Sequence, residues 1–389
     1  MRAMIAAHTA LERRYDIDWL RILAVLLLIP YHTAVIFNRG YVSYIKAEPN
    51  AAMEAFAYFL NQWHMALLFL VSGAAAWFSL QSRGGFQFFR ERINRLIIPL
   101  IFGTFAVVPV QVYFQRLYYH EFSGSYIQFY PHSFDGIYPH GNFTWGQLWF
   151  LAYLFVFSVL TLPLFLYLRT NKGQMDISKI AVFCEKPGVV FLAAIPLMLA
   201  QALFRAKWPG FQNLYNDWAN FALYITVFCY GYILCADPRF FESVERRRSI
   251  SIVLAIVSMA LILALRQTGL PPPPDYSLNW ILYMLLHGFS SWCWLMTLLG
   301  FGRRYLKFTN RILDYATEAV LPFYILHHAV IVAISYYVVR WQTTIVVKFL
   351  CISVLSLALA TLIYDLLIRR VYVTRFLFGM KAKPRRKPL

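Results

Sequence analysis

Charged side chains are scarce in this chain of 389 residues: they account for 14% of the sequence, whereas hydrophobic residues account for 60%. Globular domains average roughly a quarter charged residues, so this composition excludes an ordinary soluble fold and indicates a protein whose apolar surface faces lipid. Cysteine is scarce as well. The five cysteines show no CxxC or Cys/His ligand spacing, so the sequence predicts neither a disulfide framework nor a metal site.

Long apolar runs, by contrast, are abundant. Ten segments approach or exceed the roughly 20 residues that a helix needs to cross hydrocarbon. They are continuously apolar and do not alternate, which favours helices over a barrel. The sequence therefore predicts an all-α polytopic membrane protein with about ten transmembrane helices. The predicted spans are Trp19–Phe37, Ala55–Leu80, Ile93–Tyr113, Gln147–Leu168, Val189–Phe204, Trp218–Cys235, Ile250–Leu265, Leu278–Gly300, Ala319–Val339 and Ile345–Ile368.

Lysine and arginine are distributed unevenly between the two sides of this arrangement. Three precede the first span, four lie in each of the four connections on the same side, and eight follow the last span, which makes 27 on one side against eight on the other. Basic residues concentrate on the cytoplasmic side of membrane proteins, so we expect both termini to be cytoplasmic. The chain then divides into a cytoplasmic N-terminal segment (1–18), a transmembrane domain (19–368) and a basic cytoplasmic tail (369–389).

The excess of basic residues gives the chain a formal net charge of +18. This charge is dispersed over short loops between spans, so topology and anionic lipid headgroups explain it better than a nucleic acid does. Membrane lipids are therefore expected partners, and no nucleic acid is expected.

The first span contains ionisable residues, which are costly inside a bilayer and are therefore informative. Arg21 and His32 are eleven residues apart, about 1100° of helical rotation, so they share one face and are separated by roughly 16 Å along the axis. Asp18, three residues before Arg21, can pair with it. Two interpretations stay open: an arginine anchor with a buried structural histidine, or a polar stripe through the membrane that ends in a base.

A second polar feature opens the third span. Arg92 and Arg95 are spaced i,i+3 and face one way, near the N-terminus of a helix that runs from the cytoplasm outwards. Two guanidinium groups beside free backbone N–H groups suit an anion such as phosphate. Ordinary anchoring by basic residues on the cytoplasmic side is the alternative.

Other polar or aromatic residues within spans have simple structural explanations when each is considered alone. Ser72 beside Gly73 suits a small-residue helix contact, His64 suits polar packing, and Trp149 suits the membrane interface. His327 and His328 are adjacent in the ninth span, so we expect at most one of them to face an active cavity. We favour His327, which shares its helix face with Tyr324.

The longest outer connection, roughly Phe114–Gly146, is rich in Tyr, Phe, Gly and His. Its aromatic faces would suit the sugar rings of an extracytoplasmic partner. An interfacial aromatic belt with a re-entrant segment explains the same composition equally well.

Taken together, these residues resemble the acyltransferase family 3 membrane proteins, which include sugar O-acyltransferases and proteins of the glucan biosynthesis protein C type. The resemblance covers most of the chain and keeps the order of the family's motifs. The matching residues are Asp18, Arg21 and His32; Phe69, Ser72 and Gly73; Arg92, Arg95, Leu96 and Pro99; Trp149, Phe150 and Leu151; and Tyr324 and His327.

The resemblance implies a transfer of an acyl group from cytoplasmic acyl-CoA, acetyl-CoA or succinyl-CoA, to a hydroxyl of an extracytoplasmic glycan, in a bacterial cytoplasmic membrane. His32 would then be the general base. Arg21, held by Asp18, would line the path of the CoA arm or help to hold its charged parts. Arg92 and Arg95 would hold the CoA phosphates.

The residues assigned to substrate binding on this resemblance are Ser72, His64, Trp149, Tyr324 and His327. The chain has His64-Met65-Ala66 where glucan-modifying relatives often carry Arg-Met-Pro, so the acceptor and the acyl group stay open. A transporter or flippase for a lipid-linked or small polar substrate is the alternative function, because polar residues inside the membrane also serve proton relays.

Overall fold

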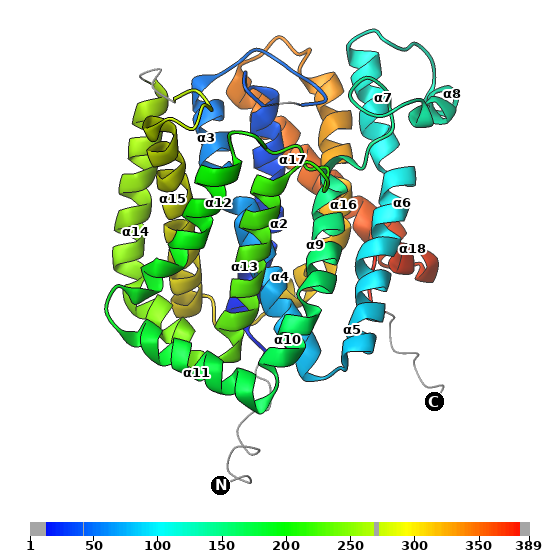
Figure 1. The fold of residues 1–389 in the computed structure, drawn as a ribbon. Helices are drawn as coiled ribbons and strands as arrows, with labels where there is room; N and C mark the ends of the chain where they lie inside the picture. The colour runs from blue at the N-terminus through cyan, green and yellow to red at the C-terminus, as the bar shows by residue number, and fades with distance from the viewer. Residues whose placement is uncertain (1–12, 42, 268–271, 382–389) are drawn as a thin grey trace, which may run out of the picture.

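The structure is a computed structural model, and it describes residues 13–41, 43–267 and 272–381. Long helices stand side by side and form one bundle (Figure 1). In chain order the helices are α2 (Tyr15–Ile36), α3 (Ala51–Asn61), α4 (His64–Gln81), α5 (Gly85–Arg92), η1 (Ile93–Ile97), α6 (Ile98–Ala106), α7 (Val108–Tyr118), α8 (Tyr126–Phe129), η2 (Tyr130–Phe134), η3 (Gly146–Leu148), α9 (Trp149–Leu160), α10 (Leu162–Leu168), α11 (Asn171–Glu185), η4 (Val189–Ala193), α12 (Ala194–Phe204), α13 (Trp218–Ala236), α14 (Pro238–Gln267), α15 (Leu278–Tyr305), α16 (Arg311–Val338), α17 (Ile345–Ile363), η5 (Tyr364–Ile368) and α18 (Tyr372–Leu377).

The expected fold class is confirmed. Within the described residues, eight helices are long and apolar enough to cross a membrane, and the number rises to ten if each of two bent pairs counts as one span. One bent pair joins Gly146–Leu160 to Leu162–Leu168 at 50°; the other joins Asn171–Glu185 to Val189–Phe204 at 120°. The protein is therefore a multi-pass integral membrane protein.

Helix ends differ from the ends of the predicted apolar segments. The predicted seventh span begins at Ile250, but α14 begins twelve residues earlier at Pro238 and continues through the charged stretch that follows it. The predicted second span is divided between α3 and α4, which meet at Gln62 and Trp63. Hydropathy marks the part of a helix that faces hydrocarbon, whereas backbone hydrogen bonds continue beyond it.

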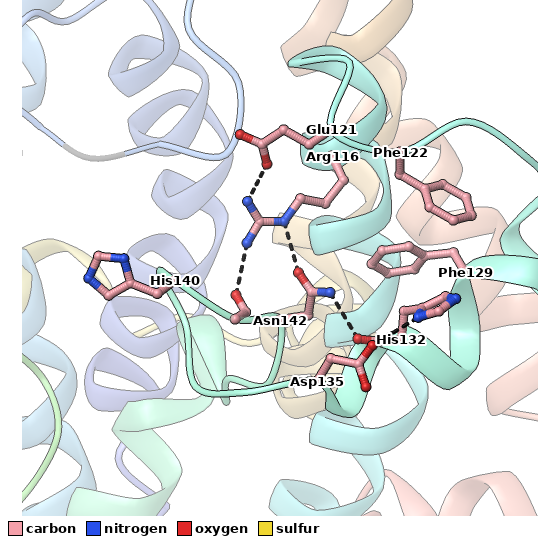
Figure 2. Close-up of a pocket in the computed structure, with 9 residues that line it drawn as sticks. Arg116, Glu121, Phe122, Phe129, His132, Asp135, His140 and Asn142 are labelled. Atoms are coloured by element: carbon pink, nitrogen blue, oxygen red, sulfur yellow. Dashed lines mark hydrogen bonds and ion pairs between the residues drawn. The ribbon is translucent and has the colours of Figure 1, made fainter.

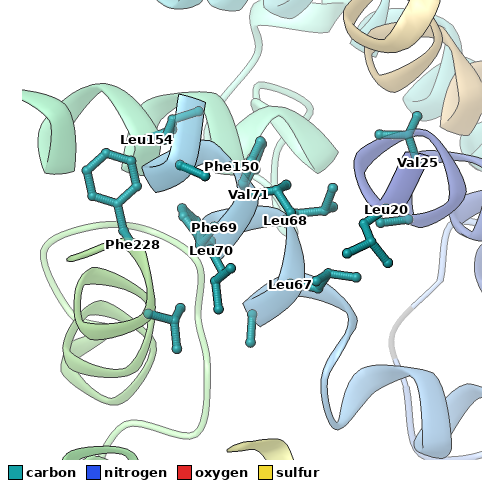
Figure 3. Packing of buried hydrophobic residues seen from close by; sticks show 14 of the residues in the cluster. Leu20, Val25, Leu67, Leu68, Phe69, Leu70, Val71, Phe150, Leu154 and Phe228 are labelled. Atoms are coloured by element: carbon teal, nitrogen blue, oxygen red, sulfur yellow. The ribbon is translucent and has the colours of Figure 1, made fainter. Parts of the chain in front are cut away.

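Helix α4 lies at the centre of the main hydrophobic core. Its consecutive residues 67–71 are all buried, so the helix is apolar on every side, as expected for a helix surrounded by others. Figure 3 shows these side chains between Leu20 and Val25 of α2 on one side and Phe228 of α13 on the other. This packing fixes α2, which carries His32, against the rest of the bundle.

Two glycines permit α4 and α13 to approach closely. A Cβ atom at Gly73 would lie 1.9 Å from the carbonyl oxygen of Phe228, and a Cβ atom at Gly231 would lie 1.8 Å from that of Leu70. Any larger residue at either position forces the helices apart. The expected small-residue contact at Ser72-Gly73 is thus confirmed for Gly73.

The connections gather at the two ends of the bundle. Figure 1 shows α3 and α8 at one end and α11 at the other. Helix α11 carries two of the lysines that were assigned to a cytoplasmic connection, Lys172 and Lys179, and a third, Lys186, follows it directly. One connection that was assigned to the cytoplasm therefore lies at the end of the bundle opposite α3 and α8. The assignment of both termini to the cytoplasm stays a prediction.

The end of the transmembrane domain is joined to a short helix that packs on the bundle. Arg375 of α18 is 5% exposed and its Nη2 lies 2.8 Å from Glu318 of α16. Gly379 follows with φ of +66°, and a Cβ atom there would lie 3.0 Å from the carbonyl oxygen of Arg95. Part of the predicted tail is thus an ordered support for η1, while residues 382–389 lie outside the described chain.

Candidate functional site

His32 lies on α2 where this helix packs against α16, and two histidines of α16 meet it there. Its ring centroid is 4.1 Å from that of His328, with an interplanar angle of 26°, and 5.2 Å from that of His327. His32 is half-buried, whereas the four residues that follow it in α2 are buried. Neighbouring rings therefore hold the His32 ring in place, and the residue keeps part of its surface accessible.

The nitrogen atoms of the two α16 histidines are only partly used. Nδ1 of His327 donates a hydrogen bond to the Tyr324 carbonyl at 2.6 Å, which assigns the ring proton to Nδ1 and leaves Nε2 as an acceptor. Nε2 of His327 and Nδ1 of His328 are buried and have no hydrogen-bond partner among the described residues. Because buried polar atoms are nearly always paired, these nitrogens are candidates for contact with a polar substrate.

His327 and His328 both lie against the His32 ring, and which of them faces an active cavity stays a prediction. His328 stacks more closely on His32 and is the less buried of the two histidines. Adjacent residues on a helix are about 100° apart. His32 lies between the directions in which the two α16 histidines point, so both of their rings contact it.

At the other end of α2, the predicted pairing of Asp18 with Arg21 is confirmed. Nη2 of Arg21 lies 2.8 Å from Oδ1 of Asp18. The second carboxylate oxygen of Asp18 is 2.8 Å from Nε of Arg13. Nε of Arg21 is buried without a hydrogen-bond partner among the described residues. Asp18 therefore fixes Arg21 through one nitrogen and leaves another donor unused.

Arg92 and Arg95 stand at the junction of α5 with the π-helical turn η1. Arg92 is 9% exposed, and its guanidinium lies 4.5 Å from the ring centroid of Phe88; its Nε has no hydrogen-bond partner among the described residues. Arg95 is more accessible and lies 3.7 Å from Glu91. It is also within electrostatic range of Arg21. Glu91 is close enough to interact electrostatically with both arginines, but Nε of Arg92 is buried without a hydrogen-bond partner among the described residues, so this junction is a candidate anion site.

His64 and Ser72 make contacts that hold helices in place. Nε2 of His64 donates to the Ala24 carbonyl of α2 at 2.6 Å, and His64 is 2% exposed. The hydroxyl of Ser72 donates to the Leu68 carbonyl one turn earlier in the same helix, at 2.7 Å. Substrate binding by either residue stays a prediction, and the structure gives both a structural contact.

Trp149 and Tyr324 belong to a buried aromatic group between α4, α9, α13 and α16. The ring of Trp149 lies 6.1 Å from that of Phe69 and 5.8 Å from that of Tyr224. The hydroxyl of Tyr324 donates to the Gln147 carbonyl. The two side chains are 6% and 3% exposed, so their assignment to substrate binding also stays a prediction.

Sequence reasoning missed a polar path that leads from His32 to the end of the bundle that holds α3. Tyr31 contacts the His32 ring edge-on at 5.0 Å, and its hydroxyl donates to Oδ1 of Asn61 at 3.5 Å. Nδ2 of Asn61 donates to the hydroxyl of Tyr41 at 3.2 Å. Asn61 is exposed and the two tyrosines are half-buried. Tyrosine and asparagine next to a span are common, so only the fold could reveal this path.

Comparison with known proteins identifies the family of this chain. A family model described as an acyltransferase domain matches residues 14–365. The chain belongs to this acyltransferase family. The matched region contains every residue assigned above to the site, which confirms the family resemblance seen in the sequence.

Curated relatives match the chain along nearly its whole length. Three of them, each 23% identical over 395 residues and covering 97% of both chains, are named glucans biosynthesis protein C. They come from Escherichia coli O81 (strain ED1a), O139:H28 (strain E24377A / ETEC) and O9:H4 (strain HS). No solved structure matches the chain.

Family and fold together give the class of the protein: it is a membrane-embedded enzyme, an O-acyltransferase. Within the described part of the chain, no three His, Cys, Asp or Glu side chains are grouped so as to hold a metal ion.

Proposed function

We propose that the enzyme takes an acetyl or succinyl group from acyl-CoA at the cytoplasmic face and transfers it to a hydroxyl of a glycan outside the membrane. The observation that carries this proposal is the half-buried His32 ring, stacked on His328 beside buried imidazole nitrogens that lack partners. An imidazole that is fixed in position and partly accessible suits a general base near neutral pH.

Arg92 and Arg95 would bind the phosphates of CoA. Arg92 supports this role best, because its guanidinium is buried and its Nε has no partner among the described residues. Planar guanidinium groups bind phosphate with two parallel hydrogen bonds. Arg21, held by Asp18 and within electrostatic range of Arg95, would line the way from this anion site to His32.

The reaction would proceed by attack of an acceptor hydroxyl on the thioester carbonyl. His32 removes the proton of the hydroxyl as its oxygen bonds to the carbonyl carbon, and the carbon–sulfur bond then breaks. The proton passes from His32 to the departing sulfur, so the products are an ester and free CoA. A general base of this kind contributes about 10²–10⁴-fold to the rate.

The acceptor would approach through the polar path of Tyr31, Asn61 and Tyr41. These side chains lead from His32 to the end of the bundle opposite α11. Hydroxyl and amide groups exchange hydrogen bonds readily with sugar hydroxyls. The relatives named glucans biosynthesis protein C favour a glucan as acceptor, and a bacterial cytoplasmic membrane as the location.

Release of CoA by the purified enzyme tests the proposal. Wild-type protein with acetyl-CoA or succinyl-CoA and a glucan is expected to release free CoA thiol and to form an esterified glucan. The His32→Ala variant is expected to lose at least about 10²-fold in rate and to remain folded. His120→Ala, at an exposed residue beyond α7, is the matched control with unchanged activity. A transporter or flippase, the alternative function, would release no thiol.

A further inference from the structure

The outer connection after α7 contains a pocket that lies apart from His32. The cavity has a volume of about 360 Å³, within the range of small-molecule sites in proteins. Figure 2 shows its lining, which comes from the end of α7, from α8 and η2, and from the loop at residues 139–142. None of these residues is part of the site described above.

Arg116 forms the frame of this pocket. Its guanidinium pairs with Glu121, and it donates to Oδ1 of Asn142 and to the carbonyl oxygen of Gly141, each at 2.8 Å (Figure 2). It also donates to the carbonyl oxygen of Pro139 at 3.1 Å. All three nitrogens of the guanidinium are used. The pocket is therefore preformed, and the positive charge of Arg116 is neutralised within the protein.

The other side chains that line the pocket are imidazole, carboxylate and aromatic groups. Nδ1 of His132 lies 2.8 Å from Oδ2 of Asp135, and both side chains are more than half exposed, at 56% and 67%. This pair does not use Nε2 of His132 or the second carboxylate oxygen of Asp135. His140 lines the pocket from the opposite loop. Phe122, half-buried and stacked edge-on with Phe129 at 5.2 Å, supplies an aromatic wall.

This combination suits a neutral sugar. Carboxylate and imidazole groups exchange hydrogen bonds with hydroxyls, and an aromatic ring packs against the apolar face of a sugar. An anion is disfavoured, because Glu121 already neutralises Arg116 and Asp135 adds a negative charge. The interfacial-belt explanation of this connection accounts for its aromatic residues and leaves the polar pocket unexplained.

A series of contacts between neighbouring rings connects the loop at residues 139–142 with His32. The ring of Tyr138, next to the loop at 139–142, lies 5.7 Å from that of Tyr44. Tyr44 lies 5.4 Å from His328, which stacks on His32. Two tyrosine side chains therefore separate the pocket's loop from the α16 histidine that supports His32, so one sugar unit cannot occupy both places.

We propose that the pocket binds a distant unit of a neutral oligosaccharide acceptor while another unit of the same chain is acylated at His32. This inference rests on the proposed function, and it adds a length requirement. The enzyme selects acceptors that are long enough to reach from the pocket to His32, and a monosaccharide gains nothing from the pocket.

The test uses the full-length protein in detergent and a series of linear gluco-oligosaccharides that begins with glucose. Binding is measured by calorimetry in the absence of acyl-CoA, and transfer is measured separately. The variant is His132→Ala combined with Asp135→Ala; Ile127→Ala, at a residue of α8 that is 83% exposed and not in the pocket lining, is the control. Both altered histidine and aspartate side chains are exposed, so the variant is expected to keep the wild-type thermal midpoint.

Wild-type protein and the Ile127→Ala control are expected to bind long oligomers more tightly than glucose. The double variant is expected to bind long oligomers about tenfold more weakly, as for the loss of one or two hydrogen bonds, and to bind glucose as the wild type does. Equal binding of all lengths by wild type and variant overturns the pocket proposal, even if CoA release depends on His32. A length preference that the variant loses supports it, even if no transfer occurs and the proposed function fails.

Discussion

His32 of α2 and His328 of α16 stack face to face, with ring centroids 4.1 Å apart and an interplanar angle of 26°. The two residues come from near opposite ends of the chain, so this contact exists only because the first and ninth predicted spans pack side by side. The stacking fixes the plane of the His32 ring, and His32 is half-buried. In the proposed reaction His328 is thus a positioning residue, and His32 is the group that touches the acceptor.

Substitutions of His328 separate positioning from proton transfer. His328→Phe keeps a flat ring against His32, so we expect kcat within about threefold of wild type, on the order of 0.5 kcal/mol. His328→Ala removes the support, and kcat is expected to fall about tenfold or more. The measurement is steady-state transfer at saturating acyl-CoA. Equal losses in both variants would show that the His328 nitrogen takes part in the chemistry, contrary to this account.

Arg92 is expected to act on the donor substrate. Arg92→Leu removes a guanidinium that would make charge-assisted hydrogen bonds to phosphate, each worth about 1.5–3 kcal/mol. We therefore expect KM for acyl-CoA to rise roughly tenfold to hundredfold. The thermal midpoint of the variant, measured alongside, checks that it remains folded.

Arg90→Ala is the matched control for Arg92, since Arg90 is exposed on the same helix. Its KM for acyl-CoA should stay unchanged. A comparable rise in KM for both variants would indicate a general effect of positive charge at this face and would remove the specific role of Arg92.

Asp18 is expected to act through Arg21. Asp18→Ala loses the 2.8 Å pair with Arg21 and should lower kcat/KM about tenfold, whereas Arg21→Ala should lower it further. The double variant should resemble Arg21→Ala, because we expect Asp18 to affect catalysis only through Arg21. Measured kcat/KM values for the three variants check this expectation. Losses that multiply in the double variant would assign Asp18 an independent role.

The contact between α4 and α13 predicts a strong effect on stability. Gly73→Ala places a methyl group 1.9 Å from the Phe228 carbonyl oxygen, so the helices must move apart, at a cost of about 1–3 kcal/mol. The thermal midpoint of the detergent-solubilised protein should fall. Gly84→Ala, with φ of −77° and no atom within 4 Å of the added Cβ, is the control and should leave it unchanged. A Gly73 variant with the wild-type midpoint would contradict the close helix contact.

Much of this architecture was predictable because bilayers impose strong local constraints. The apolar segments mark where helices cross, since backbone polar groups in hydrocarbon must be paired within the helix. The pair of Asp18 with Arg21 was predictable for a similar reason: residues three apart on a helix are neighbours wherever the helix lies.

Contacts between distant segments could not be predicted in the same way. The roles of His328, of Tyr31 with Asn61, and of the pocket beside Arg116 depend on how helices are rotated and shifted against each other. Hydropathy contains no information about how the helices are rotated and shifted against each other. The same limit explains why His327 was favoured over His328: helical periodicity places adjacent side chains about 100° apart, and the approach of α2 decides which of them is met.

The central claim is that the acyl group crosses from a cytoplasmic donor to an outer acceptor at His32, and sealed proteoliposomes of known protein orientation test it most directly. Acyl-CoA with a radioactive acyl group is supplied on the face that carries α11, glucan on the opposite face, and the label on the glucan is counted. Labelled glucan is expected from the wild type in this arrangement, with no labelling when donor and acceptor are exchanged and none from His32→Ala. Labelling that survives in His32→Ala, or that requires donor and acceptor on the same face, would contradict the account.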